Sequence, residues 1–139
     1  MRHDLQGFSH KEVCLAHTVG KKTAKLMRGL SYVDKDGVRY CSPARMTTDG
    51  FSIPRAFWRV IGPPYASEYL IAAVIHDQGC NYAHELNKTN HEEAVKYRKE
   101  IDELFREMLI FLGCNRFKAW LMYRGVRIGA RSMKPIKKA

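Results

Sequence analysis

The chain has 139 residues, 45% of them hydrophobic, which suits one domain with a single packed core and excludes an intrinsically disordered chain. Its longest apolar run, around Tyr69–Ile75, is much shorter than the roughly 18–20 residues that span a bilayer, so no transmembrane segment is expected. The net charge of +10 favours contact with phosphates or anionic surfaces, but it also keeps a protein in solution and therefore selects no partner by itself.

The first half of the chain predicts a small antiparallel sheet. Residues 1–24 show no clean periodicity and are expected to form a loose N-terminal segment. Two β-prone runs, Leu26–Val33 and Val38–Cys41, lie on either side of the polar turn Asp34–Gly37, a combination typical of a β-hairpin. A third strand is expected to end near Thr48.

The second half predicts four helices, over Ala56–Ile61, Ser67–Cys80, Asn90 to Gly113, and Arg116–Ile128. The second helix is almost wholly apolar and should be central, and a loop over Asn81–Thr89 follows it. Asn90 is a good cap for the third helix. The core stripe of that helix has residues three and four positions apart: Ala94, Tyr97, Ile101, Leu104, Phe105 and Met108. The fourth helix is expected to be anchored by Trp120, Leu121 and Tyr123.

These elements predict an α+β fold, in which the small sheet packs on three or four helices. Residues 1–139 are expected to form a single domain, because no internal repeat or second domain is evident. The tail Arg131–Ala139 is basic and is expected to be loose.

The chemistry of the chain is concentrated in the adjacent pair His76 and Asp77, which directly follows the apolar run Ala72–Ile75. Burying such a pair is costly unless hydrogen bonds satisfy it. In one interpretation His76 ties two elements together and Asp77 lies near the surface. In the other, His76 is a general base, and Asp102 reaches it from the next, antiparallel helix and orients its ring. Arg98 lies one turn before Asp102, where it forms either part of the site or an ordinary solvated ion pair.

A second group of charges precedes the helices. Asp49 lies in an Asp-Gly turn, and Arg55 is expected in the first turn of a helix, where a cation opposes the helix dipole. Because that placement calls for a nearby anion, we expect the segment Thr48–Arg55 to pack beside the apolar helix, with Asp49 or Arg55 near Asp77. The alternative is a structural turn with a local salt bridge.

Four cysteines lie far apart and form no CxxC pair: Cys14, Cys41, Cys80 and Cys114. Since no secretion signal precedes them, free buried thiols are expected rather than disulfides. The spacing of these residues does not predict a zinc site. A structural zinc ion could bind only if the fold happened to bring His84 and His91 next to Cys80.

An ordered series of motifs runs through most of the chain: Thr48–Arg55, Trp58, Gly62–Pro64, Ala72–Asp77, Arg98, Asp102–Phe105, Leu121–Tyr123 and Val126–Arg127. Together they resemble the phage and prophage family called domain of unknown function 1353. The resemblance implies a virus or prophage origin and no assigned chemistry. The chain departs from the family at Cys80, where an aromatic residue is frequent, which argues against a role for a tyrosine hydroxyl there.

A His-Asp pair on a helix, answered by an aspartate on the next helix, also resembles phospholipase A2 enzymes. That resemblance implies that His76 is the base for water, that Asp77 binds calcium and that Asp102 orients His76. The chain lacks the glycine-rich calcium loop and the disulfide framework of those enzymes. Nucleotide phosphohydrolases of the His-Asp domain type need a further upstream metal-binding histidine in a helical fold, and His17 lies in a segment expected to be non-helical.

Two functions remain open. In the first, the protein is a phage or prophage hydrolase that uses His76 as the base for water and Asp102 to orient it. The substrate or a divalent cation would be held by Asp49, Arg55, Asp77 and Arg98. An open cleft in which His76 lies together with Asp49, Asp77 and Asp102 would favour this function. The residue pattern specifies no metal, substrate or oligomeric state.

In the second, the protein is a non-catalytic phage structural or accessory component that binds protein or nucleic acid through its basic surface. Lys134, Lys137 and Lys138 would carry part of that binding. A buried His76 without a cleft would favour this function. In either case the absence of an apolar signal region after Met1–Asp4 predicts the host bacterial cytoplasm or the virion as the location.

Overall fold

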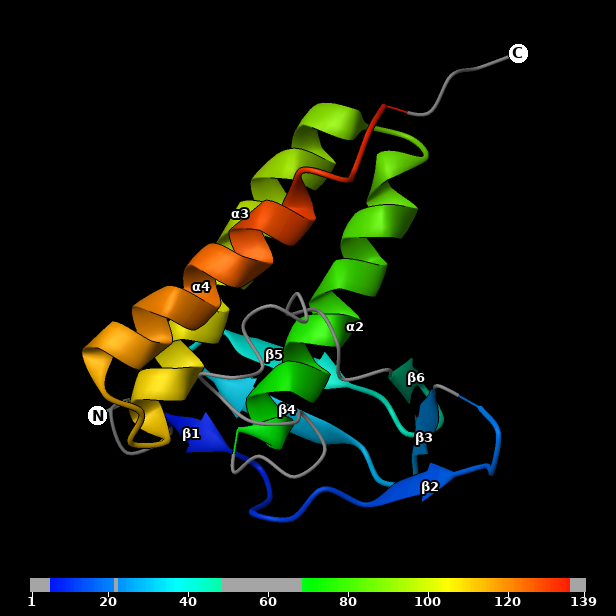
Figure 1. Ribbon diagram of the computed structural model, residues 1–139, viewed down its shortest axis with the longest axis vertical. Coiled ribbons are helices and arrows are strands. Elements are labelled where there is room, and N and C mark those ends of the chain that lie inside the picture. The colour runs from blue at the N-terminus through cyan, green and yellow to red at the C-terminus, as the bar shows by residue number, and fades with distance from the viewer. Residues whose placement is uncertain (1–5, 22, 49–68, 136–139) are drawn as a thin grey trace.

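Two small antiparallel sheets from the first half of the chain pack at one end of three long helices from the second half (Figure 1). The computed structural model describes residues 6–21, 23–48 and 69–135. The predicted α+β class is confirmed, with two sheets in place of one. The helix expected over Ala56–Ile61 lies outside the described residues. None of the described helices has both the length and the apolar character needed to cross a membrane.

The described residues form six short strands, and all strand pairs are antiparallel. One sheet has the order β1-β4-β5, with β1 at Gly7–Phe8, β4 at Leu30–Val33 and β5 at Arg39–Ser42. The other has the order β2-β3-β6, with β2 at Leu15–His17, β3 at Ala24–Leu26 and β6 at Thr47–Thr48. Strands β1 and β2 lie in the N-terminal segment for which no element was predicted. The expected strand Leu26–Val33 is divided, because its two ends pair in different sheets.

The predicted hairpin is confirmed as the β4–β5 pair, in which Leu30 lies opposite Ser42. The Asp34 carboxylate closes the turn by accepting two backbone N–H groups at 2.9 Å each. Gly37 has a φ of +85°, a conformation that glycine adopts without the strain of a side chain. Strand β6 ends at Thr48, as expected for the third strand.

The helices are α2 at Leu70–Asn87, α3 at His91–Phe111 and α4 at Arg116–Ala130. The side chain of Asn90 accepts a backbone N–H at the start of α3, as predicted for its cap. The predicted end of α2 at Cys80 is wrong, because the helix continues through most of the expected loop Asn81–Thr89. In this stretch Ala83 and Asn87 are buried four residues apart, and residues such as Asn81 and Glu85 are exposed. This is the pattern of an amphipathic helix end rather than of a loop.

The buried face of α4 also differs from the prediction. Trp120 is 42% exposed, and Leu121 and Tyr123 are half-buried. The buried positions are instead Ala119, Met122, Gly125 and Val126. Spacing along the helix, rather than aromatic bulk, therefore decides which side of α4 packs on the core.

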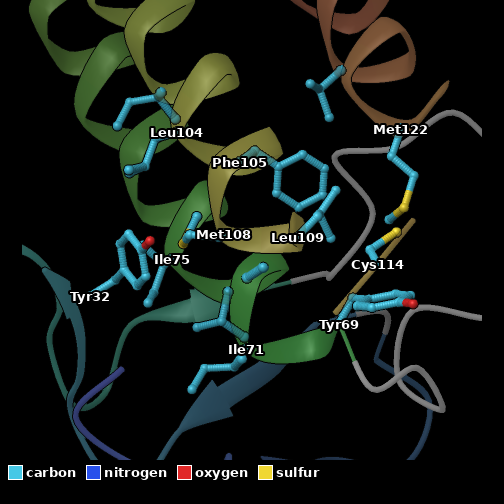
Figure 2. Packing of buried hydrophobic residues seen from close by; sticks show 14 of the residues in the cluster. Tyr32, Tyr69, Ile71, Ile75, Leu104, Phe105, Met108, Leu109, Cys114 and Met122 are labelled. Atoms are coloured by element: carbon cyan, nitrogen blue, oxygen red, sulfur yellow. The ribbon is translucent and has the colours of Figure 1, made fainter. Parts of the chain in front are cut away.

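The main core lies where the sheets meet the lower turns of the helices (Figure 2). Tyr32 of β4, Ile75 of α2 and Phe105 of α3 are each at most 2% exposed within it. Helices α2 and α3 approach closely at Gly79, where a Cβ atom would lie only 2.6 Å from the side chain of Ile101. This close approach holds the histidine of α2 against the aspartate of α3.

Candidate functional site

His76 of α2 and Asp102 of α3 meet inside the protein. His76 Nε2 lies 2.6 Å from Asp102 Oδ1, and both residues are 0% exposed. The predicted hydrogen bond between the two helices is confirmed. Because an ionised carboxylate can only accept, Nε2 carries the proton, and the lone pair of a neutral His76 ring belongs to Nδ1. The ring of Phe105 packs on the imidazole with 4.9 Å between centroids, which restricts its rotation.

Two arginines hold the Asp102 carboxylate from its other sides. Arg98 Nε lies 3.0 Å from Oδ1, and Arg127 Nη1 lies 2.8 Å from Oδ2. Arg98 also donates to the backbone carbonyl of Val126 on α4 at 3.1 Å. The predicted Arg98–Asp102 pair is confirmed, but it is not solvated, because the Arg98 side chain is only 8% exposed. One carboxylate therefore ties α2, α3 and α4 together.

The protonation of the pair follows from its surroundings. Burial alone lowers the pKa of His76, but the Cys80 sulfur and the hydrogen bond with Asp102 outweigh it and raise this pKa to about 9. Burial alone raises the pKa of Asp102, but the hydrogen bond with His76 and the charges of His76 and Arg98 hold it below its ordinary value. At neutral pH the pair is therefore an imidazolium against a carboxylate.

A polar pocket of about 480 Å³ lies beside this pair, between the second sheet and the helices. Hydroxyl, amide and charged side chains line most of it. They include Thr47, Thr48, Asp77, Cys80, Asn81 and Arg98. His76 has no exposed surface, so it connects to the pocket only through neighbours. Cys80 contacts His76, and Arg98 contacts Asp102.

Asp77 is 7% exposed rather than near the surface, and it lines the pocket. Its Oδ2 accepts a hydrogen bond from the Thr48 hydroxyl of β6. Thr48, the first residue of the segment Thr48–Arg55, therefore lies beside Asp77, and the packing of the rest of that segment stays a prediction. Asp49 and Arg55 lie outside the described residues, so their proximity to Asp77 stays a prediction.

Two residues of this site were not among the candidates chosen from the sequence. Cys80 Sγ lies 3.7 Å from each ring nitrogen of His76. The spacing of four residues on one helix was the available signal for this contact. Arg127 left no local signal, because it lies 25 positions from Asp102 on a different helix.

The four cysteines differ in their exposure. All four cysteines are free, but Cys14 and Cys41 are exposed, so the expectation of buried thiols is wrong for these two. Cys114 is buried and Cys80 is half-buried. In the described part of the chain, no three or more His, Cys, Asp or Glu side chains gather where they could hold a metal ion.

A larger hollow of about 760 Å³ lies over the first sheet and the helices α3 and α4. Acidic and basic side chains line it together, among them Lys35, Glu100 and Arg106. Glu107 at its edge already accepts the Tyr32 hydroxyl at 2.7 Å. We favour the smaller pocket as the functional site, because only that pocket adjoins the His76–Asp102 pair.

Fold and site together define an α+β protein with a buried His-Asp-Arg network behind a polar pocket. Residues 24–126 match the family described as "Protein of unknown function (DUF1353)", and the chain belongs to this family. The family predicted from the ordered motifs is therefore confirmed.

Two relatives come from Sinorhizobium fredii (strain NBRC 101917 / NGR234). "Uncharacterized protein y4iH" is 31% identical over 108 residues, which are 77% of this chain and 41% of the relative. "Uncharacterized protein y4jT" is 41% identical over 56 residues, which are 40% of this chain and 17% of the relative. The chain thus spans less than half the length of these relatives. No solved structure matches the chain.

Proposed function

We propose that this protein is a small hydrolase of phage or prophage origin, in which His76 transfers protons at the polar pocket. One observation carries the proposal: the buried His76–Asp102 pair lies directly behind a pocket whose wall contacts both of its members. Cys80 links the pocket to His76, and Arg98 links it to Asp102. A proton-transfer group needs a fixed ring and a fixed tautomer, which such a network supplies.

Each residue of the network has a role in this reaction. Asp102 keeps the Nε2 proton of His76 in place, so that Nδ1 is the nitrogen that exchanges a proton with the reacting groups. Arg98 and Arg127 keep Asp102 ionised and in position. Asp77, held by Thr48, binds a polar group of the substrate or a cation. Asp49 and Arg55 remain candidates for the same binding role.

The lining of the pocket supports a small polar substrate. Hydroxyl, amide and charged groups such as Thr47, Asn81 and Arg98 offer hydrogen bonds and little apolar surface. A volume of about 480 Å³ lies in the range of small-ligand sites. A lipid chain would find few apolar partners there, which argues against a phospholipase-like substrate.

The resemblance to phage and prophage proteins supports the proposed origin and, with it, the host bacterial cytoplasm or the virion as the location. A non-catalytic phage structural or accessory role is the second candidate. The complete burial of His76 and the three donors on Asp102 favour it, because both also describe a purely structural tie. The net charge of +10 would then serve binding to a nucleic acid or an acidic protein.

The test compares two variants on small polar esters and amides. His76→Gln keeps an amide N–H for Asp102 but cannot shuttle a proton, whereas His17→Gln changes an exposed histidine on β2 as a matched control. We expect His76→Gln to slow hydrolysis by roughly 10²–10⁴-fold while it stays folded. Equal rates for His76→Gln and the parent protein would contradict the hydrolase and favour the structural role.

A further inference from the structure

Cys80 is the cysteine that contacts the His76–Asp102 pair. Its sulfur lies 3.7 Å from His76 Nδ1, and the residue is half-buried and lines the pocket. The thiol therefore meets the imidazole on one side and the pocket on the other. Cys14 and Cys41 are exposed and Cys114 is buried in the main core, and none of them shares this position.

We propose that Cys80 is the nucleophile of this site, with His76 as its proton-transfer partner and Asp102 as the residue that orients His76. The proposal rests on the hydrolase function proposed above and replaces water by the thiol as the first attacking group. A nucleophile in contact with a base, and a base held by a third group, is the arrangement from which thiol enzymes draw their reactivity.

The local geometry brings thiol and imidazole together without tertiary constraints. Cys80 follows His76 by four residues on α2, so both side chains lie on one face of the helix. The sulfur is equally far from both ring nitrogens, so it lies off the direction of the Nδ1 lone pair. A rotation of the Cys80 side chain must align it before the proton moves. Such contacts are often long in unliganded enzymes and shorten when the substrate binds.

The protonation of His76 favours the thiol over water as the nucleophile. A pKa of about 9 keeps His76 protonated at neutral pH, and an imidazolium cannot accept a proton from water. An imidazolium beside the Cys80 sulfur stabilises the negative charge that the sulfur carries when it attacks. The protonation that opposes direct activation of water is therefore compatible with attack by sulfur.

The reaction would consume a small polar ester or thioester. The Cys80 thiolate attacks the carbonyl carbon and forms a C–S bond, and the bond from that carbon to the leaving oxygen or sulfur breaks as the leaving group takes the proton from His76. Water then attacks the carbonyl carbon of the resulting thioester as His76 accepts a proton from it, a C–O bond forms, the C–S bond breaks, and His76 returns the proton to the Cys80 sulfur. The products are a carboxylic acid and an alcohol or thiol. Asn81 and Arg98 on the pocket wall are available donors for the oxyanion.

The experiment uses the full chain with Cys14→Ser and Cys41→Ser, so that Cys80 and the buried Cys114 are the remaining thiols. The protein is mixed with p-nitrophenyl acetate, and the intact mass and peptide map are followed over time. We expect a single acetyl group on Cys80, formed roughly 10²-fold faster than in the same protein with His76→Gln. We also expect iodoacetamide to alkylate Cys80 more slowly in the His76→Gln protein than in the parent.

Two further variants separate this proposal from the hydrolase function. Cys80→Ala should stay folded and abolish both the adduct and hydrolysis. If Cys80→Ala hydrolyses the ester at the parental rate while His76→Gln does not, water is the nucleophile and the role of Cys80 is overturned, but the hydrolase remains. If neither variant changes hydrolysis, both proposals fail. Acetylation of Cys80 at a rate independent of His76 would likewise overturn the proposed pair.

Discussion

At the scale of single residues, Asp102 accepts a hydrogen bond from one donor on each helix: His76 on α2, Arg98 on α3 and Arg127 on α4. Its carboxylate is fully buried. Removing it would leave a histidine and a nearly buried arginine together without a counterion. Because an uncompensated buried charge is costly, removing this carboxylate should destabilise the protein far more than removing one member of a surface ion pair.

We expect Asp102→Ala to lower the free energy of unfolding by about 3–5 kcal/mol, because it strands buried cations. His76→Ala should cost on the order of 2–4 kcal/mol, through a cavity and an unpaired carboxylate. Urea unfolding measures both, with the exposed neighbour Glu103→Ala as the matched control. A midpoint for Asp102→Ala equal to that of the control would show that the network does not hold the helices.

Because His76 is buried, the stability of its alanine variant does not distinguish a structural from a catalytic role. A catalytic histidine at the edge of a cleft would lose little stability on substitution, because water replaces its ring. His76 is 0% exposed, so a structural and a catalytic role both predict a large loss for alanine. The His76→Gln variant separates the two roles better, because it preserves a donor to Asp102 and removes the charge and the proton transfer of the ring.

The pH dependence of stability should carry the signature of the pair. The pKa of His76 rises from 6.5 to about 9 on folding, so its contribution is complete below about pH 6.5 and is lost as the pH rises through 9. The pKa of Asp102 is lowered on folding, so its contribution is present above its ordinary pKa of 3.8 and is lost as the pH falls below that value. Stability should therefore be greatest between these limits.

The expected loss between about pH 6.5 and 9.5 is on the order of 3 kcal/mol, the free energy that corresponds to the rise in the His76 pKa. Urea unfolding across this range measures it. In His76→Gln the alkaline decline should disappear, because the side chain no longer titrates. The same alkaline decline in parent and variant would assign it to other groups.

At the scale of elements, the packing of α2 on α3 depends on Gly79. We expect Gly79→Ala to destabilise the protein by about 1–3 kcal/mol, although alanine is the better helix former. The added Cβ would lie 2.6 Å from the buried side chain of Ile101, so the two helices must separate or Ile101 must move. Separation would also lengthen the hydrogen bond between His76 and Asp102.

A double-mutant cycle with Ile101→Ala tests this explanation by thermal unfolding. Ile101→Ala alone creates a cavity, but it should also make room for the Cβ at position 79. The cost of Gly79→Ala should therefore be smaller in the Ile101→Ala background than in the parent. Strictly additive costs would show that the strain lies elsewhere.

At the scale of the whole molecule, the charge of +10 predicts weak, sequence-independent binding of nucleic acid. Phe117 and Trp120 are 68% and 42% exposed among the basic residues of α4, so they offer stacking surfaces for unpaired bases of any sequence. Affinity should fall steeply with added salt, and Lys134→Ala, Lys137→Ala and Lys138→Ala together should weaken it. Fluorescence anisotropy with two unrelated oligonucleotides measures this affinity. No binding even at low salt would eliminate nucleic-acid binding as a function of the protein.

Local chemistry determined much of this protein from its sequence. The turn at Asp34–Gly37 and the cap at Asn90 depend on residues a few positions apart, and both are present as predicted. The apolar spacing on α3 likewise identified a buried stripe, with Ile101 and Phe105 at 1% exposure. Even the Asp102–His76 contact followed from sequence order, because consecutive helices joined by a short loop are antiparallel neighbours.

Only the tertiary structure decided how deep the site lies and what completes it. Arg127 reaches Asp102 from α4, and Thr48 reaches Asp77 from β6, across separations that leave no periodic signal in the sequence. The extension of α2 to Asn87 and the exposure of Trp120 were likewise hidden. One physical reason explains why the sequence did not predict these two contacts, the length of α2 or the exposure of Trp120. Sequence periodicity defines a face of an element, but the rotation and depth at which that face packs depend on the combined shape of every neighbour.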